Sequence, residues 1–331
     1  MTAGGGDAPL RDSFGRTIDY LRVSVTDNCN LRCVYCMPAT GVERRTHDEI
    51  LRFEELERIL RVAVDLGIRR IRVTGGEPLV RRGIVDFLAR VAHLPGTEEV
   101  TLTTNGVLLD ELAEPIRAAG VRRLNVSLDT LRPERFRELT RGGSLGRVLR
   151  GVAAAEAAGF DPLKLNVVLL RENLEEVEHF AALTRERALH VRFIELMPLG
   201  EGSCYAGGHF VPATEARRRL EERFELEPAL VQGSGPAVSW RVRGGRGTVG
   251  FIAALTEHFC DRCNRLRLSA DGRLSPCLAS DQAVSLRDAL RGGATDRELV
   301  RLLHLAVRAK PQEHRMESGQ GKGRRMSQLG G

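Results

Sequence analysis

Three cysteines lie within eight residues near the start of the chain, at Cys29, Cys33 and Cys36. A structural zinc ion is normally enclosed by four protein ligands. Three thiolates can instead hold three irons of a cubane iron–sulfur cluster and leave the fourth iron open for another ligand. This set therefore favours a cluster with an open iron. A zinc knuckle or three buried structural cysteines is the alternative.

A second set of three cysteines follows far downstream, at Cys260, Cys263 and Cys277. Two such sets, one near each end of the chain, predict two clusters that each have an open iron. The alternative is a zinc site, either shared between the sets or completed by His258, because a Cys-x-x-Cys pair with a distant cysteine is common in zinc modules. Cys204 has no neighbour at ligand spacing and is interpreted as a free thiol.

The composition of the chain narrows the classes of function that these cysteines can serve. The 331 residues are 42% hydrophobic, enough for a substantial core, and contain no apolar run long enough to span a membrane. The net charge of +6 permits an anionic ligand without requiring nucleic acid, and three Tyr and one Trp provide few base-stacking platforms. Residues 1–7 lack the apolar core of a signal peptide. We therefore expect a cytoplasmic protein whose clustered cysteines serve metal or redox chemistry rather than disulfides.

Strand-like segments alternate with helix-like segments before residue 212. Six strands are predicted, at Tyr20–Thr26, Arg70–Thr74, Val100–Thr104, Arg123–Leu128, Lys164–Leu170 and Val191–Leu196. The predicted helices are Phe53–Leu66, Arg81–Leu94, Asp110–Ala119, Pro133–Leu139, Gly146–Ala158 and Leu174–Arg187. Strand–helix units in series predict a parallel sheet with helices outside, either an open barrel or a doubly wound sheet.

The pattern changes in the last third of the chain. A helix at Thr214–Phe224 precedes a glycine-rich stretch with short strands, and the second cysteine set follows. We predict that residues 1–212 form the barrel and that residues 213–311 form a smaller module carrying the second cluster. Residues 312–331, rich in Gly, Lys and Arg, are expected to form a flexible tail.

Alternation along the strands places polar and cationic residues on one face. In the first strand Leu21 and Val23 share a face, so Arg22 points the other way. The apolar faces must pack against the outer helices. The opposite, inner faces then carry Arg22, Arg72, Thr103, Ser127, Lys164 and Arg192. Buried cations need partners, so this pattern predicts an anionic ligand inside the sheet. Solvent-facing strands are the alternative, but parallel sheets rarely have them.

Short motifs follow the strands at the edge where ligands of α/β folds collect. Gly75-Gly76-Glu77-Pro78 follows the second strand, and glycines allow a backbone to approach a ligand closely. Thr104-Asn105-Gly106 ends the third strand and Ser127-Leu128-Asp129 ends the fourth.

These motifs together resemble the radical S-adenosyl-L-methionine (SAM) enzymes and, within them, the GTP 3′,8-cyclase family of molybdenum-cofactor biosynthesis. The resemblance spans nearly the whole chain. It rests on Cys29–Pro38, Ile71–Leu79, Arg192–Pro198, Val249–Ile252, Phe259–Leu268, Ala270–Gly272, Pro276–Leu278 and the terminal double glycine. Departures are small: Asn28 stands where a basic residue is common, and Leu196 replaces a commoner Phe.

The resemblance implies an α/β fold, a partial (βα)6 radical-SAM barrel with a smaller C-terminal module carrying a second cluster. It implies two 4Fe–4S clusters, the first held by Cys29, Cys33 and Cys36 with SAM, the second by Cys260, Cys263 and Cys277 with the substrate. The SAM-binding residues implied are Tyr35, Gly75, Gly76, Glu77, Ser127 and Met197. The GTP-binding residues implied are Arg22, Arg72, Thr103, Lys164, Arg192, Arg265 and Arg267. The terminal Gly330 and Gly331 would assist catalysis.

The implied activity is that of a radical SAM lyase, which cyclises GTP to 3′,8-cyclo-7,8-dihydro-GTP in the first committed step of molybdenum cofactor (molybdopterin) biosynthesis. In this chemistry reductive cleavage of SAM gives a 5′-deoxyadenosyl radical, which takes hydrogen from C3′ of GTP, and the carbon radical attacks C8 of guanine. The implied partners are an external electron donor and the cyclic pyranopterin monophosphate synthase that takes the product. A homodimer is possible, and no membrane or nucleic-acid partner is expected.

Two other functions fit parts of the pattern. One is a radical-SAM maturase that modifies peptides, although such enzymes usually carry more cysteines in their C-terminal part. The other is a non-catalytic nucleic-acid binder built around zinc or a cluster. Iron and sulfide content and dependence on GTP separate these functions from the cyclase.

Overall fold

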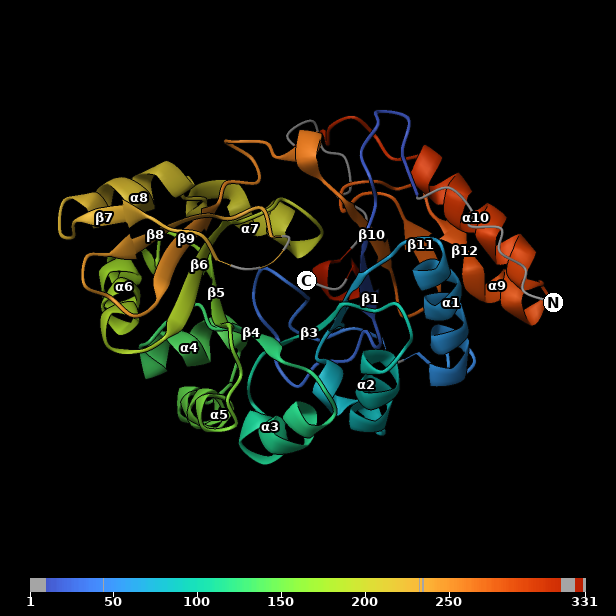
Figure 1. The fold of residues 1–331 in the computed structure, drawn as a ribbon. Helices are drawn as coiled ribbons and strands as arrows, with labels where there is room; N and C mark the ends of the chain where they lie inside the picture. The colour runs from blue at the N-terminus through green and yellow to red at the C-terminus, as the bar shows by residue number, and fades with distance from the viewer. Residues whose placement is uncertain (1–9, 44, 232, 234, 317–324, 330–331) are drawn as a thin grey trace.

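The centre of the fold is a curved sheet of parallel strands with helices on its outer side. A computed structural model describes residues 10–43, 45–231, 233, 235–316 and 325–329. Its strands form one twelve-stranded sheet in the order β12-β11-β10-β1-β2-β3-β4-β5-β6-β9-β8-β7. Figure 1 shows most of the helices on the convex side of this curve and the short red helix at the C-terminus inside it.

The six predicted strands form the middle of this sheet and pair in chain order, all parallel. They are β1 (Tyr20–Ser24), β2 (Arg70–Thr74), β3 (Glu99–Thr104), β4 (Arg123–Ser127), β5 (Leu163–Leu169) and β6 (Leu189–Glu195). The outer helices are α1 (Phe53–Asp65), α2 (Ile84–Ala92), α3 (Leu109–Ala118), α4 (Pro133–Thr140), α5 (Leu145–Ala157) and α6 (Val177–Glu186). The predicted partial (βα)6 barrel is confirmed.

One predicted helix begins later than expected. The segment expected to be helical from Arg81 instead begins α2 at Ile84, after a 3₁₀ turn at Pro78–Val80. Gly83 precedes α2 with φ of 79°, a left-handed conformation that is not helical and that favours glycine. The chain therefore turns before α2 can start.

The apolar strand faces pack against the helices, as the alternation predicts. Along β5, Leu163, Leu165, Val167 and Leu169 are buried, whereas the residues between them are half-buried. Phe193 of β6 packs between α6 and the neighbouring strand, with its ring centroid 6.2 Å from that of Phe180 and 5.5 Å from that of Phe251. The polar faces of the strands are thereby left on the concave side.

The last third of the chain adds strands to both edges of this sheet. At the β6 edge lie β9 (Thr248–Ile252), β8 (Val238–Val242) and β7 (Leu226–Pro228), and at the β1 edge lie β10 (Arg265–Leu268), β11 (Arg273–Ser275) and β12 (Val284–Ser285). β9 runs parallel to β6, and β10 runs parallel to β1. Residues 253–264, which include Cys260 and Cys263, therefore cross from one edge of the curved sheet to the other.

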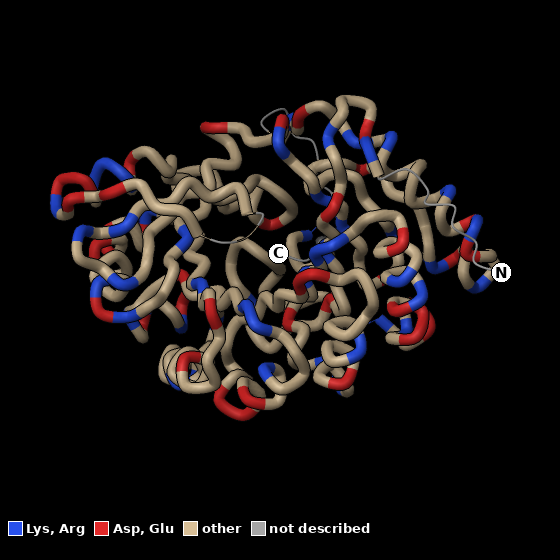
Figure 2. Tube along the Cα trace, in the orientation of Figure 1, with Lys and Arg blue, Asp and Glu red and all other residues tan. Residues whose placement is uncertain are grey.

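Five further helices accompany these strands: α7 (Glu201–His209), α8 (Ala213–Glu221), α9 (Leu286–Arg291), α10 (Asp296–Arg308) and α11 (Met326–Leu329). α10 packs on α1 and α9 on the outer side of the β1 edge. Figure 2 shows positive and negative residues interspersed over the outer helices. No helix in the described part of the chain is long and apolar enough to cross a membrane.

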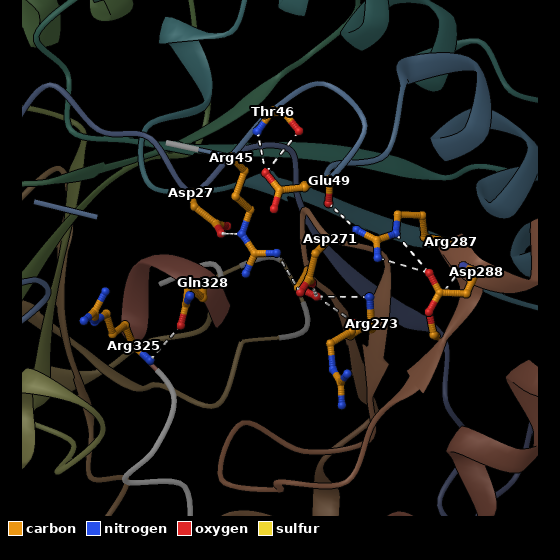
Figure 3. A network of polar contacts seen from close by, with 12 residues as sticks. Asp27, Arg45, Thr46, Glu49, Asp271, Arg273, Arg287, Asp288, Arg325 and Gln328 are labelled. Carbon is orange, nitrogen blue, oxygen red and sulfur yellow. Dashed lines mark hydrogen bonds and ion pairs between the residues drawn. The ribbon is translucent and has the colours of Figure 1, made fainter. Parts of the chain in front are cut away.

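Ion pairs attach the loop after the first cysteine set to the C-terminal strands (Figure 3). Arg45 Nε lies 2.8 Å from Asp27 Oδ2, and Arg45 Nη1 lies 3.0 Å from Asp271 Oδ2 in the β10–β11 turn. Arg287 donates from Nη1 to the carbonyl oxygen of Glu49 at 2.5 Å. The chain around the first cysteine set is thereby fixed to the part of the fold that follows the second set.

Glu195, the last residue of β6, attaches two later segments to the barrel. Its Oε1 accepts the backbone N–H of Ala213 at 2.9 Å and the hydroxyl of Thr256, and its Oε2 accepts the N–H groups of Leu255 at 2.8 Å and Thr256 at 3.1 Å. The side chain is fully buried. One carboxylate therefore satisfies four donors, three of them backbone N–H groups at the start of α8 and after β9.

We predict that Glu195→Gln lowers the free energy of unfolding by roughly 1–3 kcal/mol, because either orientation of the amide places its NH₂ donors against buried N–H donors. Chemical denaturation measures this loss. Glu222→Gln is the matched control, since Glu222 only forms an exposed ion pair with Arg218 and should change stability little. Equal stability of the Glu195 variant and wild type would show that Glu195 does not attach these segments.

Candidate functional site

A cavity of about 260 Å³ lies on the concave side of the sheet, and each of the strands β1 to β6 contributes to its lining. The predicted site residues that line it are Arg22, Cys29, Cys33, Tyr35, Cys36, Arg72, Gly75, Gly76, Thr103, Ser127, Met197, Arg265 and Arg267. The other predicted residues that the structure describes lie outside this lining: Glu77, Lys164, Arg192, Cys260, Cys263 and Cys277. The cavity thus gathers most of the predicted cluster, SAM and GTP residues.

Strand register explains why the cations meet. Arg22 lies opposite Arg72 on β2 and Arg267 on β10, and Tyr20 lies opposite Arg265 in the same pairing. Successive side chains of a strand alternate faces, so residues two apart share a face. The inner face predicted from alternation is therefore the face that carries these arginines. β6 ends at Glu195, two residues before Met197, so Met197 does not follow the alternation of that strand.

The first cysteine set lies at one end of the cavity. The sulfur of Cys29 accepts the backbone N–H of Leu31 at 3.4 Å and the side-chain amide of Asn105 at 3.7 Å. Burial raises the pKa of the Cys36 thiol to about 12, with a further contribution from Cys29. Burial likewise raises the pKa of Cys33 well above its usual value, and Cys36 adds to this. Bound metal ionises a coordinating thiol, so three such thiols in one cavity fit an iron–sulfur cluster.

The two glycines after β2 lie against the chain that leads into Cys29. A Cβ on Gly76 would lie 2.5 Å from the backbone oxygens of Asp27 and Asn28, and a Cβ on Gly75 would lie 2.6 Å from that of Thr26. The backbone N–H of Gly76 donates to the oxygen of Thr26 at 2.7 Å. The sequence predicted that these glycines allow a close approach of the backbone, and in the structure that approach is to the cysteine loop. Both glycines also line the cavity.

Glu77 faces the protein rather than the cavity. Its Oε1 accepts the N–H of Leu79 at 3.0 Å and the hydroxyl of Thr104 at 2.7 Å, and its Oε2 accepts the N–H of Asn105 at 2.6 Å. Burial raises the pKa of Glu77 to about 7, although these donors oppose the shift. Glu77 therefore fixes the loop after β2 to the end of β3, and its contact with SAM stays a prediction.

Tyr35 is held in the cavity wall by a residue that the predicted site omitted. The Tyr35 hydroxyl donates to Asp129 Oδ2 at 2.5 Å, and Asp129 Oδ1 accepts the N–H of Val168 at 2.8 Å. Burial raises the pKa of Asp129 to about 6. The position of Asp129 at a strand end was noted in the sequence, but no spacing rule linked it to Tyr35.

The second cysteine set is assembled from two places in the chain. Cys260 begins a short 3₁₀ turn between β9 and β10 and Cys263 follows that turn, whereas Cys277 follows β11. Burial raises the pKa of Cys260, and both Cys277 and Cys263 add to this, so the three thiols are close neighbours. Burial opposes ionisation of Cys263, but Lys310 and Arg265 outweigh it and lower the pKa of that thiol.

Both sets differ from a site for a single ion. Among the residues that the structure describes, no group of three His, Cys, Asp or Glu side chains is placed to hold one metal ion. All seven cysteines are free thiols, and Cys204 is exposed. The ring of His258 packs on that of His314 with centroids 4.3 Å apart. Cysteines that each bind a different iron of a cubane need not converge on one point, so both sets fit 4Fe–4S clusters.

Buried cations lie at the other end of the cavity and beside it. Burial lowers the pKa of Lys164 to about 7, and Arg192, Arg123 and Arg72 add to this. Burial, followed by Arg265, lowers the pKa of Arg267 to about 10. Lys164 and Arg72 line a smaller adjoining pocket, and Arg192 donates to the Ser239 hydroxyl at 3.0 Å. An anion here would stabilise every one of these cations.

Two buried polar atoms support a ligand at this end. Within the described part of the chain, Arg72 Nε and Thr103 Oγ1 are buried without a hydrogen-bond partner. Buried polar groups in folded proteins nearly always have a partner. Both residues line the main cavity, so a polar ligand in that cavity is a natural partner for them.

The C-terminal helix α11 reaches this cavity. Met326 and Ser327 belong to its lining, and a backbone hydrogen bond from Ser327 reaches the sulfur of Cys36. Met326 also packs in a small apolar cluster with Met316 and Leu199. Parts of the predicted tail are thus packed against the fold, whereas Gly330 and Gly331 lie outside the described residues.

The chain is similar to known proteins along its length. A family model for the Radical SAM superfamily matches residues 23–184, and one for Molybdenum Cofactor Synthesis C matches residues 189–316. The GTP 3′,8-cyclase of Moorella thermoacetica is 50% identical over 97% of this chain and 100% of its own. That of Heliobacterium modesticaldum is 52% identical over 97% of this chain and 99% of its own.

Solved structures share the fold at low identity. SuiB of Streptococcus suis bound to S-adenosylmethionine superposes with a TM-score of 0.61 and 16% identity, over 90% of this chain and 76% of that chain. A second SuiB structure gives a TM-score of 0.59 at 16% identity, over 82% of this chain and 65% of that chain. These likenesses concern the arrangement of strands and helices.

We predict that Gly76→Ala displaces the chain before Cys29, because the added Cβ would overlap backbone oxygens that cannot move independently. Overpacking of this kind costs about 1–3 kcal/mol of stability. The thermal unfolding temperature and the iron content after anaerobic reconstitution should both decrease. Gly207→Ala is the control, since a Cβ there meets nothing within 4 Å and φ is −62°. Full iron content and unchanged unfolding in the Gly76 variant would contradict this contact.

Proposed function

The chain belongs to the GTP 3′,8-cyclase family, and from that membership we propose that its cavity holds SAM and GTP next to each other. It is a radical SAM enzyme that cyclises GTP to 3′,8-cyclo-7,8-dihydro-GTP in the first committed step of molybdenum cofactor biosynthesis. One observation carries the proposed arrangement: a single cavity joins the first cysteine set at one end to buried arginines at the other. Reactants held in one dry cavity are oriented for reaction and protected from water.

The SAM end is built by the cysteine loop and the strand ends. Cys29, Cys33 and Cys36 hold the first 4Fe–4S cluster, which when bound supplies the electron that cleaves SAM. Tyr35, Gly75, Gly76, Ser127 and Met197 lie around the same part of the cavity and bind SAM. Glu77 belongs to the same proposed SAM-binding set, and its buried hydrogen bonds to Thr104 and Asn105 hold the loop that carries Gly75 and Gly76 against the end of β3.

The GTP end is built by cations and the second cysteine set. Arg265 and Arg267 are two residues apart on β10 and follow Cys263. They therefore share one face of the strand, and both line the cavity. Arginine binds phosphate oxygens in pairs, which suits a triphosphate. Arg22, Arg72, Thr103, Lys164 and Arg192 complete the set that binds GTP. Cys260, Cys263 and Cys277 would hold a second 4Fe–4S cluster, which would supply an iron able to bind the substrate.

The tail completes the site. α11 lies in the cavity wall, so Gly330 and Gly331 follow directly from a helix that lines the cavity. The two glycines assist catalysis by positioning groups after SAM has been cleaved.

The partners follow from the chemistry. An external electron donor reduces the first cluster, and the cyclised nucleotide passes to cyclic pyranopterin monophosphate synthase. A homodimer is one assembly compatible with the fold. Six cysteines that serve clusters and a seventh that is an exposed free thiol suit a reducing compartment, which supports a cytoplasmic location. No membrane or nucleic-acid partner is part of the proposal.

Separate removal of the two cysteine sets tests this function. Replacing Cys29, Cys33 and Cys36 together by Ala should halve the iron content and abolish 5′-deoxyadenosine formation from SAM, dithionite and GTP under anaerobic conditions. Replacing Cys260, Cys263 and Cys277 together should also halve the iron, retain SAM cleavage and abolish the cyclised product. Iron and sulfide analysis and mass spectrometry of the products measure these outcomes. A full iron load in either triple variant, or zinc without sulfide, would make the cluster assignment wrong.

Proton uptake tests the role of Lys164 in binding GTP. Its pKa near 7, below the usual value, leaves Lys164 mostly neutral at pH 8. A bound phosphate favours the charged form and raises that pKa, so GTP binding at pH 8 should take up a proton. Calorimetry in buffers of different ionisation enthalpy measures the uptake. The Lys164→Met variant should bind GTP more weakly, and its binding should take up no proton. Proton release by wild type, or equal uptake by the variant, would exclude Lys164 as the group that becomes charged.

A further inference from the structure

Lys310 is a buried cation that the proposed reaction does not use. Lysine stands at only three positions, Lys164, Lys310 and Lys322, although Lys and Arg together number 50. Lys310 follows α10 and is only 3% exposed. A buried ammonium group is costly unless each of its donors has a partner. A chain that otherwise uses arginine almost throughout thus keeps a lysine at this buried position.

Three acceptors surround the Lys310 ammonium. Its Nζ donates to the sulfur of Cys263 at 3.4 Å, to the carbonyl oxygen of Arg265 at 2.8 Å and to that of Pro276 at 2.9 Å. A lysine ammonium has three N–H donors, so these partners use all of them. None of the three is a carboxylate, so the Cys263 sulfur is the one partner among them that can carry a negative charge. A planar guanidinium would present its donors as a fork, which does not match three acceptors around one nitrogen.

The contacts of Lys310 connect the two parts of the second cysteine set, the turn with Cys260 and Cys263 and the segment with Cys277. Cys263 is touched directly, and Pro276 immediately precedes Cys277 in the chain. The same segment continues to His314, whose backbone forms a hydrogen bond with the sulfur of Cys260. Arg16 donates to the carbonyl oxygen of Cys260 at 2.5 Å and to that of Pro311 at 2.5 Å, so the segment is fixed in place. Residues 310–314 therefore run beside the cysteines as a second layer around them.

We propose that Lys310 is a positioning residue that raises the reduction potential of the second cluster, an inference that rests on the proposed assignment of Cys260, Cys263 and Cys277 to a 4Fe–4S cluster. Hydrogen bonds to sulfur and nearby charge set the potential of such clusters. A reduced cluster carries one more negative charge than an oxidised one. A fixed ammonium on a ligand sulfur stabilises the reduced form more, and the two carbonyl contacts hold the ammonium there.

The test is a potentiometric titration of the holoenzyme followed by electron paramagnetic resonance. Addition of SAM identifies the first cluster, because only its signal should change, and that cluster serves as an internal reference. In Lys310→Met the second cluster should show at least a tenfold lower ratio of reduced to oxidised form at a fixed potential, which corresponds to ~59 mV for a one-electron couple. The first cluster should keep its potential.

Three other variants separate charge from geometry. Arg308→Met removes an exposed positive charge two residues away and should leave both potentials unchanged. Lys310→Arg keeps the charge in a different geometry and should shift the second potential less than Lys310→Met does. Lys310→Gln keeps an N–H donor without the charge and should lower the potential about as much as the Met variant.

An unchanged potential of a fully loaded second cluster in Lys310→Met or Lys310→Gln would overturn the proposal. Loss of that cluster from both variants would also overturn it, because Lys310 would then be needed for assembly. The assignment of a second cluster to Cys260, Cys263 and Cys277 is tested separately, on the wild-type protein. If wild type holds only one cluster per chain, that assignment is wrong before any Lys310 variant is made.

Discussion

Mutual repulsion of cations on the concave face is the constraint on which the rest of this structure depends. Arg22, Arg72 and Arg267 lie opposite one another on adjacent strands, inside a sheet whose other face is closed by helices. Burial lowers the pKa of Arg22 well below its usual value, and Arg267 and Arg72 lower it further. Like charges repel more strongly in a protein interior than in water, because the effective dielectric is lower there. An anionic ligand bound between these side chains would offset that cost.

The parts of the fold that depend on local pattern were predictable. Each of the six central strands lies within two residues of its predicted bounds, because alternation and flanking turns define a strand within one short segment. The faces were predictable for the same reason. The start of α10 is also marked locally, by a capping box of Thr295 and Glu298. The additions to both sheet edges were not predictable, because short strands such as Val284–Ser285 carry too little pattern to specify a partner.

The site shows the same division between local and distant information. Cysteine spacing and the glycine pair were enough to predict a SAM end, since each lies in one continuous run. The contacts that hold those runs in place join residues far apart in sequence: Glu77 binds Asn105, and Tyr35 binds Asp129. One sequence gives no distance between such residues. Chemical type narrowed the choice, because a strand-end carboxylate is a common partner in α/β folds, but geometry was needed to pair them.

The segment after α10 contacts both cysteine sets in turn. Lys310 donates to Cys263, His314 bonds to Cys260, and Ser327 bonds to Cys36 across the cavity. A backbone N–H or an ammonium on a ligand sulfur stabilises the ionised form that metal binding needs. One stretch of chain therefore supports both sets, while residues 253–264 cross between the edges of the sheet and carry two cysteines of the second.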